Sequence, residues 1–515
     1  MIDSGAVSGK VLASGVKAYL GIPYAAPPVG ELRWRDPQPV KPWKGVYHAD
    51  RKMPECMQVL RPHNINNYFG EEPTSENCLY MNVWAPPSAR AGAKLPVIVF
   101  IYGGGGTIGS SGMAIYDGEQ VARRGAVLVS FNYRVGILGF MAHPEVTQEQ
   151  GGHSGNEGYL DQNAALKWVN RNIARFGGDP AKVVVTGQSA GASSVTQQIF
   201  SPLSKGLFRA AVMWSGCNWG GGGSPSAAAE KTGLEIQKVL KAGNLNDMRQ
   251  VPADRIIAIQ AESQVGVSAA GFRTGGVIDG YFSPKPQAEI LAAHEINDVP
   301  IIASFTHDEA GIALKQAKTV DEYKAAAAKL FGDAAGEFLK LYPVSSAAEI
   351  PAVAQEAAND SAGLRNSCNC ASLQAKYNKS AAYIMVFARK HPYTPGVKIA
   401  DQDIATIGAY HASEIPYLFG TLDAYNMFRP TRNWTPHDRD LSEKMTAALI
   451  AFANTGNPAT SAVPWPAWSA ENPQYISFGD KISIEKVNTA RLDFTTRHPL
   501  GGGMMPPRPR TSPLD

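Results

Sequence analysis

A serine flanked by two glycines is the strongest candidate for chemistry in this chain. Gly187, Ser189 and Gly191 form a Gly-x-Ser-x-Gly pattern directly after three valines, 183–185, and small residues that tolerate a helix follow. A strand that enters this pattern and continues as a helix makes a tight turn, which exposes the serine hydroxyl above the sheet. A turn signal at 176–180 brackets the strand on its other side. We therefore predict that Ser189 is a nucleophile that attacks acyl bonds.

A serine at its ordinary pKa needs a base, and the base needs an acid that orients it. Among ten histidines, His411 is the best candidate, because it follows the serine in the chain and lies in a loop before the apolar run 415–419. Asp308 and Glu309 come directly after a predicted strand, 299–305. Carboxylates at that point lie on the active edge of a parallel sheet. Residue order does not choose between the two, and either could instead cap a helix.

Four glycines, Gly103 to Gly106, follow the predicted strand 97–101. Bare glycine backbone lets N–H groups approach a ligand closely. Such a loop, together with the N–H of Ala190, would hold the oxyanion formed during acyl transfer. The alternative interpretations are a flexible glycine loop and a phosphate-binding loop. The Gly-Lys-Ser/Thr sequence that completes a phosphate-binding loop does not follow here.

Composition narrows the function classes. The chain has 515 residues, 44% of them hydrophobic, and a formal net charge of +3. This charge is too small to indicate nucleic-acid binding, and no apolar run approaches the ~20 residues needed to span a membrane. Residues 1–4 do not resemble a signal peptide, so the chain either starts there natively or has lost a leader.

Five cysteines are present. Cys56 and Cys78 flank a polar loop, and a bridge between them would imply an oxidising compartment, although two unrelated thiols are equally compatible with the sequence. Cys217, Cys368 and Cys370 have no zinc-site spacing, and their state is left open.

The apolar runs predict a covered sheet. Strands are expected at 79–84, 95–101, 126–131, 299–305 and 383–387, with a helix at 160–173 and an edge meander within 10–50. Alternating strands and helices indicate a doubly wound α/β sheet. The helical stretches up to about 295 and at 320–390 lie between strands, so we interpret them as insertions. We therefore predict one domain over residues 8–497 and a Pro/Gly-rich tail, 498–515.

These motifs together resemble the type-B carboxylesterase/cholinesterase-like family, and in particular its bacterial para-nitrobenzyl-esterase-like carboxylesterases. The resemblance extends over about residues 8–495. Besides the serine motif, it is carried by residues 18–25 (Ala-Tyr-Leu-Gly-Ile-Pro-Tyr-Ala), 75–84 (Ser-Glu-Asn-Cys-Leu-Tyr-Met-Asn-Val-Trp), 132–136 (Asn-Tyr-Arg-Val-Gly) and 155–162 (Gly-Asn-Glu-Gly-Tyr-Leu-Asp-Gln).

The resemblance implies an α/β-hydrolase fold, with a large, mostly parallel central sheet, helices on both faces and helical insertions over the active site. It also implies roles for individual residues. These are Ser189 as nucleophile, His411 as base, Glu309 rather than Asp308 as acid, Gly104, Gly105 and Ala190 as oxyanion donors, Ser215 close to the triad, a Cys56–Cys78 disulfide, and the ion pairs Arg33–Glu76 and Arg134–Asp161.

Two positions depart from the family pattern. Gly106 stands where the family usually has an aromatic residue, so we expect an enlarged acyl pocket. Gln188 stands where cholinesterases carry an acidic residue, which argues against a cationic choline substrate.

We therefore predict a serine carboxylesterase that forms an acyl-enzyme and needs neither metal nor organic cofactor. Its expected substrates are small-molecule esters with bulky groups, such as xenobiotic or secondary-metabolite esters, mycotoxins included. The alternatives are a catalytically silent adhesion protein of this fold, and an amide or thioester hydrolase with the same triad. We expect a monomer or weak homo-oligomer, without nucleic-acid partners, that is secreted or periplasmic; a cytoplasmic location is the alternative.

Overall fold

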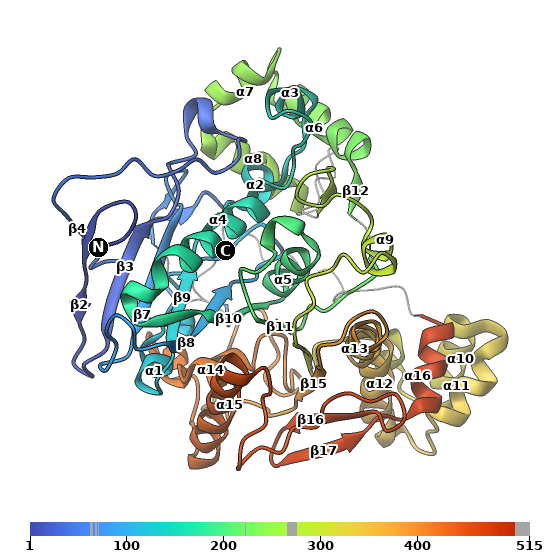
Figure 1. Ribbon diagram of the computed structural model, residues 1–515. Helices are drawn as coiled ribbons and strands as arrows, with labels where there is room; N and C mark the ends of the chain where they lie inside the picture. Colours follow the sequence, from blue (N-terminus) through green and yellow to red (C-terminus); the bar gives the residue numbers. More distant parts are fainter. Residues whose placement is uncertain (62–64, 67–68, 71, 222, 265–275, 500–515) are drawn as a thin grey trace.

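An eleven-stranded sheet forms the centre of the computed structural model, which describes residues 1–61, 65–66, 69–70, 72–221, 223–264 and 276–499 (Figure 1). The strand order is β17-β16-β15-β14-β11-β10-β8-β9-β7-β3-β2. The strands of this sheet are β2 (Lys10–Val11), β3 (Lys17–Pro23), β7 (Tyr80–Ala85), β8 (Leu95–Ile101), β9 (Val127–Phe131), β10 (Gly178–Gln188), β11 (Ala210–Trp214), β14 (Ile301–Thr306), β15 (Ala382–Phe387), β16 (Gln474–Phe478) and β17 (Ile482–Lys486).

The strands from β9 to β16 pair in parallel, whereas the pairs at both edges are antiparallel. Every residue of β9, β11, β14 and β15 is buried. Their mostly apolar character follows from this position, because a parallel sheet is covered on both faces. The predicted α/β-hydrolase fold with a mostly parallel sheet is therefore confirmed.

Helices cover both faces of the sheet. On one face, α4 (Glu157–Asn172) and α5 (Ala190–Phe200) pack on β10, and α5 also contacts β11; on the other, α15 (Pro436–Thr455) packs on β8 and β10 (Figure 1). The remaining helices are α1 (Glu119–Arg123), α2 (Gly136–Phe140), α3 (Pro144–Glu149), α6 (Ser226–Leu240), α7 (Leu245–Gln250), α8 (Ala253–Gln264), α9 (Gln287–Ala292), α10 (Val320–Phe331), α11 (Ala335–Leu341), α12 (Ile350–Asn359), α13 (Arg365–Tyr377), α14 (Ile415–Phe419) and α16 (Thr489–Arg497).

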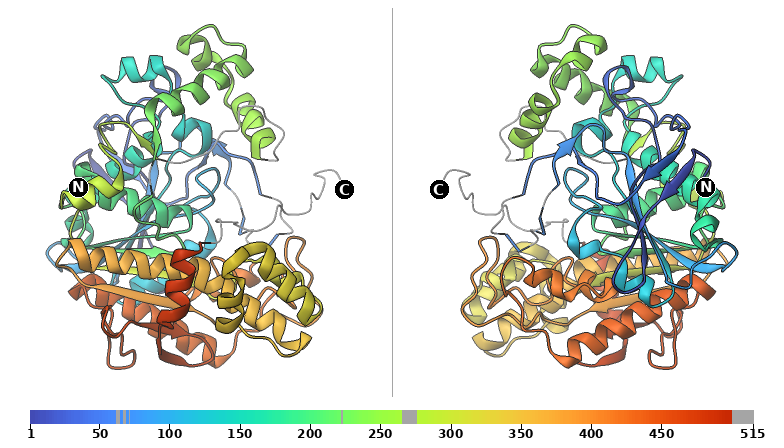
Figure 2. Two further views of the ribbon diagram at one scale, coloured as in Figure 1. Left: turned by 90° about the vertical axis from the view of Figure 1, so that its right-hand side faces the viewer. Right: turned by 90° about the vertical axis from the view of Figure 1, so that its left-hand side faces the viewer.

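Two groups of inserted helices lie at different ends of the molecule, as Figure 2 shows. Helices α6–α9 stand between β11 and β14, and α10–α13 stand between β14 and β15. In the first group, α6–α8 pack on α2 around Ile137, Ile236 and Ile256, separately from the main core, whereas α9 belongs to the main core. In the second group, α10–α12 pack with α16 around Tyr323 and Phe338, whereas α13 packs on β14 and β15. Most of the inserted helices thus have small cores of their own beside the sheet.

The N-terminal region differs from the expected simple meander. Only β2 and β3 join the central sheet at this edge, while β1 (Ala6–Ser8) and β4 (Val46–His48) form a separate parallel pair. Two further short pairs join β5 (Glu55–Cys56) to β6 (Thr74–Ser75) and β12 (Ser224–Pro225) to β13 (Val277–Ile278). The domain limit at residue 497 stays a prediction, since residues 500–515 of the expected tail lie outside the described ranges.

Disulfides join Cys56 to Cys78, as the resemblance implies, and Cys217 to Cys370, a pair that the sequence left open. Cys368 is a buried free thiol. Within the ranges described, no helix combines the length and the apolar composition needed to cross a membrane.

Candidate active site

Ser189 occupies a strained turn between β10 and α5. Its φ of 58° and ψ of −122° lie in a region that residues with a Cβ rarely adopt. A Cβ on Gly187 would stand 2.2 Å from the Gly191 carbonyl oxygen, and a Cβ on Gly191 would stand 2.1 Å from that of Ile101. The two glycines are therefore sterically required, because the strand, the turn and the helix approach one another too closely for any side chain there.

His411 and Glu309 are in direct contact. The Nδ1–H of His411 donates to Glu309 Oε2 over 2.6 Å, and the Thr306 hydroxyl donates to the same oxygen over 2.9 Å. Glu309 has a side chain only 14% exposed, whereas that of His411 is 38% exposed. The imidazole can thus meet a substrate while its carboxylate partner is shielded from water, which strengthens the interaction between them.

Asp308 has a different position from its neighbour. Its Oδ2 accepts a hydrogen bond from Ala409 N–H over 2.7 Å, and its own N–H donates to the Ala409 carbonyl over 2.9 Å. A Cβ on Gly408 would stand 2.2 Å from that same Oδ2. Asp308 therefore braces the backbone of the loop that carries His411, and it is Glu309 that reaches the imidazole.

Gln188 makes the second contact of the imidazole. Its Nε2 lies 3.2 Å from His411 Nε2, and the Gln188 side chain is buried. In the described part of the chain, the Ser189 hydroxyl makes no hydrogen bond to His411. The structure thus brings His411 to the residue immediately before Ser189. Hydrogen bonds at catalytic sites are often longer without substrate than with it.

The glycine loop packs against this turn. A Cβ on Gly103 would lie 2.5 Å from the Gln188 carbonyl oxygen and 2.9 Å from Ser189 Cβ. Gly104 and Gly105 follow with φ values of 114° and 64°. Ala190 is the first residue of α5, so its N–H has no partner within the helix. The predicted oxyanion donors therefore come from two segments that meet beside Ser189.

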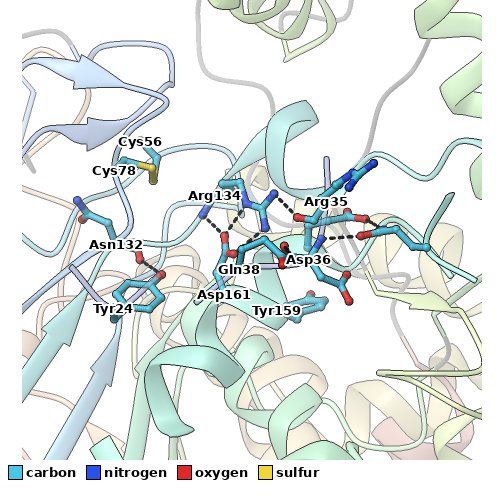
Figure 3. Close-up of polar contacts among 12 residues, drawn as sticks. Tyr24, Arg35, Asp36, Gln38, Cys56, Cys78, Asn132, Arg134, Tyr159 and Asp161 are labelled. Atoms are coloured by element: carbon cyan, nitrogen blue, oxygen red, sulfur yellow. Dashed lines mark hydrogen bonds and ion pairs between the residues drawn. A yellow bond between two sulfur atoms is a disulfide. The ribbon is translucent and has the colours of Figure 1, made fainter. Parts of the chain in front are cut away.

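The buried ion pair Arg134–Asp161 lies next to the segment that contacts the glycine loop 103–106. Arg134 contacts Asp161 through two hydrogen bonds of 2.7 and 2.8 Å, and a third bond of 2.8 Å joins Arg134 to the Arg35 carbonyl (Figure 3). Two residues further on, Gly136 N–H donates to the Gly106 carbonyl over 2.7 Å. Gly106 is buried and has a φ of 70°. The ion pair therefore fixes the segment that holds this glycine.

The disulfide near the N-terminus supports the far end of the same loop. Gln58, two residues after Cys56, donates to the Gly109 carbonyl over 2.8 Å and accepts from Gly109 N–H over 2.7 Å. Figure 3 shows the Cys56–Cys78 bridge in the same close-up as Arg134, to its left. The predicted ion pair Arg33–Glu76 is also present, with a shortest separation of 2.6 Å.

Ser215 follows β11 with a φ of 52°, and its N–H donates to the Ser304 carbonyl over 2.9 Å. Its hydroxyl is buried and has no hydrogen-bond partner among the described residues. A Cβ on the next residue, Gly216, would stand 2.6 Å from the Ser189 carbonyl oxygen. The segment around Ser215 thus touches the nucleophile turn, although the structure gives its hydroxyl no contact with the triad.

Glu414 is a buried residue near the site that was not predicted from the sequence. This residue lies three positions after His411, is 1% exposed, and neither carboxylate oxygen has a hydrogen-bond partner within the described residues. Burial, reinforced by the nearby charge of Glu309, raises the pKa of Glu414 to about 8. Its neighbours 415–419 form the short apolar helix α14. A lone carboxylate directly before such a run is the signal that could have drawn attention to it.

Two effects act on the pKa of His411 in opposite directions. Burial lowers the pKa of His411, but the hydrogen bond to Glu309 and the surrounding negative charge outweigh it, so the pKa lies above its ordinary value of 6.5. For Asp308, burial acts to raise the pKa, but hydrogen bonds from His307 and from Ala409 N–H hold it below the ordinary range. A strand-end serine, a histidine of raised pKa, a shielded carboxylate and nearby glycine amides together suit acyl transfer.

Comparisons with known proteins agree with this chemistry. The carboxylesterase family model matches residues 1–495. The chain is 35% identical to the fumonisin B1 esterase of Sphingopyxis macrogoltabida, over 93% of this chain and 86% of that protein. It is 32% identical to the para-nitrobenzyl esterase of Bacillus subtilis (strain 168), over 92% and 93%.

A solved structure of a PNB esterase superposes with a TM-score of 0.77 at 30% sequence identity, covering 96% of this chain and 98% of that chain. These matches, which extend over nearly the whole length of each partner, confirm the predicted family and enzyme class. The protein belongs to the carboxylesterase family and is a carboxylic ester hydrolase.

Proposed function

We propose that Ser189, His411 and Glu309 are the catalytic triad of this esterase. The observation that carries the proposal is the 2.6 Å bond between His411 and Glu309, near a partly exposed serine in a strained turn. Ser189 attacks the ester carbonyl while His411 Nε2 accepts its proton. Glu309 stabilises the imidazolium that forms. His411 then protonates the leaving alcohol, and water attacks the acyl-enzyme in the same way.

The oxyanion of each tetrahedral intermediate accepts hydrogen bonds from the N–H groups of Gly104, Gly105 and Ala190. One such donor typically contributes about 3 kcal/mol to the barrier reduction. In the resting site, the Gln188 amide donates to the lone pair of His411 Nε2 that must take the serine proton. The contact between Gln188 and His411 has to break before Nε2 can accept the proton of Ser189. Until then, Gln188 favours the neutral imidazole with its proton on Nδ1.

The proposed substrates are esters with a bulky acyl part. Two features support this class: Gly106 is buried where the family usually has an aromatic residue, and Gln188 is uncharged and offers no attraction to a cationic substrate. One relative is named for hydrolysis of fumonisin B1, a mycotoxin, and we extend this substrate class to the present chain. The two disulfides favour an oxidising compartment, and we propose that the protein is secreted or periplasmic.

Replacing Ser189 with alanine should abolish the burst of chromogenic alcohol from a 4-nitrophenyl ester and lower kcat by roughly 10⁴- to 10⁶-fold. Ser193→Ala is the matched control, because Ser193 is exposed on the same helix, and it should keep nearly full activity. Stopped-flow absorbance measures both. Turnover that survives in Ser189→Ala would contradict the proposed nucleophile. A parallel series of amide and thioester substrates tests the alternative specificity.

Glu309→Gln should lower kcat by about 10²- to 10⁴-fold, because the amide cannot stabilise the imidazolium. Only the neutral imidazole accepts a proton, so kcat/KM of the wild type falls as the pH drops through the pKa of His411, above 6.5. Glu309→Gln removes the carboxylate charge that raises this pKa, so the midpoint of the pH profile of kcat/KM should move to lower pH. Asp308→Asn, which alters the neighbouring carboxylate, should leave the midpoint in place. A shift in the asparagine variant instead would assign the acid to Asp308.

Glu414→Gln should change how stability depends on pH. The folded-state pKa of about 8 exceeds the ordinary 4.5, so the wild type is stabilised below pH 4.5 and loses that contribution as the pH rises to about 8. The loss amounts to several kcal/mol, roughly 1.4 kcal/mol per pH unit. Relative to the wild type, the glutamine variant should thus gain stability from pH 5 to pH 8. Thermal unfolding at both values measures this, with exposed Glu289→Gln as control. If the unfolding temperatures of wild type and Glu414→Gln change with pH in parallel, Glu414 is ionised in the folded protein and the prediction is wrong.

Gly106→Phe should weaken turnover of esters with bulky acyl groups more than turnover of acetates. Any side chain at this position meets the cost of a φ of 70°. Gly106→Ala carries that backbone cost without the bulk, and it is the control. The ratio of kcat/KM for 4-nitrophenyl pivalate to that for 4-nitrophenyl acetate should fall at least about tenfold in the phenylalanine variant only. Equal losses on both esters would exclude Gly106 from the acyl pocket.

A further inference from the structure

A small pocket of about 40 Å³ lies between residues of the 424–432 segment on one side and residues 65, 66 and 69 on the other, and the nucleophile turn does not line it. Its walls are mixed. Ile65, Phe69 and Ile399 are apolar, whereas Arg432 and Arg429 are cationic. A few polar groups that converge in an apolar wall are typical of small-molecule sites, and the small volume limits the ligand to a few heavy atoms.

Arg432 is the most unusual of these residues, because it is only 2% exposed and yet its hydrogen-bond partners among the described residues are all neutral. Its Nη2 donates to Asn66 Oδ1 over 2.5 Å, and its Nε donates to His391 Nδ1 over 3.3 Å. Burial and the charge of Arg432 lower the pKa of His391 to about 3, so this histidine is neutral. No carboxylate in the described ranges lies within ion-pair distance of Arg432.

Two tyrosine rings enclose the guanidinium. It stands 3.9 Å from the ring centre of Tyr393 and 4.7 Å from that of Tyr425. Such contacts contribute about 2 kcal/mol when desolvated. The usual cost of burying an unpaired charge is several kcal/mol, and buried charges are normally paired for that reason. The rings therefore compensate the charge only in part. Asp401 accepts from Asn66 N–H over 2.9 Å, so it is linked to Arg432 through Asn66.

A second arginine stands at the rim. Arg429 is exposed and makes no ion pair with the described carboxylates. Next to it, Phe428 is 61% exposed and also lines the pocket. One buried cation, one exposed cation and an apolar wall thus face the same space.

We propose that this pocket binds a small carboxylate, with its oxygens toward Arg432 and Arg429 and its alkyl part against Ile65, Phe69 and Ile399. A planar guanidinium matches a carboxylate geometrically. The apolar walls favour an alkyl carboxylate over a fully polar anion such as phosphate. Carboxylic acids are also what an esterase releases, so the enzyme meets this class of ligand during turnover.

Butyrate and its neutral isostere butyramide are suitable probes, titrated by saturation-transfer NMR against the full chain. Wild type should bind butyrate at least about tenfold more tightly than butyramide. Arg429→Gln should weaken butyrate binding about threefold or more, because an exposed charge contributes modestly. Arg432→Gln should weaken it more than about tenfold. Arg90→Gln, at an exposed arginine outside the pocket, is the control and should not change binding.

Equal affinities for butyrate and butyramide would overturn the proposal, because the pocket would then not favour a negative charge and the tyrosine rings would be enough to stabilise the charge of Arg432. Butyrate binding that survives unchanged in Arg429→Gln and Arg432→Gln would overturn it too, because the ligand would then occupy the active site or another surface. If Arg432→Gln does not fold, the comparison of probes and the Arg429→Gln variant decide the question. None of these readouts depends on ester turnover, so the result is independent of the proposed triad.

Discussion

The strained backbone at Ser189 is the constraint on which the site depends. A φ of 58° at a residue with a side chain persists only where the surroundings leave no alternative. Here Gly187 and Gly191 let the strand and helix approach within contact of each other, and Gly103 brings the glycine loop against the serine. The same close approach places the glycine loop and Ala190 beside Ser189. The serine turn and the position of the proposed oxyanion donors are thus two results of one packing arrangement.

The electrostatics of the site depend on keeping a single charged carboxylate beside the imidazole. Glu309 bonds to His411 and raises its pKa. Glu414, three positions after His411, is buried without a hydrogen-bond partner among the described residues and is held protonated near neutral pH. A second full negative charge would raise the pKa of His411 further, and a larger fraction of the base would be protonated. Gln188, neutral by chemistry, acts in the same direction. The environment therefore favours a base that is free to accept a proton near neutral pH.

Sequence reasoning succeeded where the chemistry is local. The serine turn could be read from a pentapeptide, because the strand, the glycines and the helix are consecutive. The choice between Asp308 and Glu309 could not be made from residue order, because both follow the same strand. It depends on which side chain reaches the imidazole of His411, since both contact the loop 408–411, and only the resemblance to the family made the choice. The Cys217–Cys370 bridge joins residues 153 positions apart, so no spacing rule could have found it. The contact of Gln188 with His411 depends on one rotamer and was equally inaccessible.

Glu414 and Arg432 show two ways in which a buried charge can be accommodated. Neither has an oppositely charged partner in contact within the described residues. A carboxylate avoids the cost of desolvation by taking up a proton, and Glu414 does so with a pKa of about 8. An arginine has no such route, since its guanidinium stays protonated at any pH at which the protein folds. Aromatic faces and neutral acceptors reduce the cost for Arg432 without removing it. The two buried groups thus have different effects on the protein. The glutamate makes stability depend on pH, whereas the arginine creates a place where an anion is favoured.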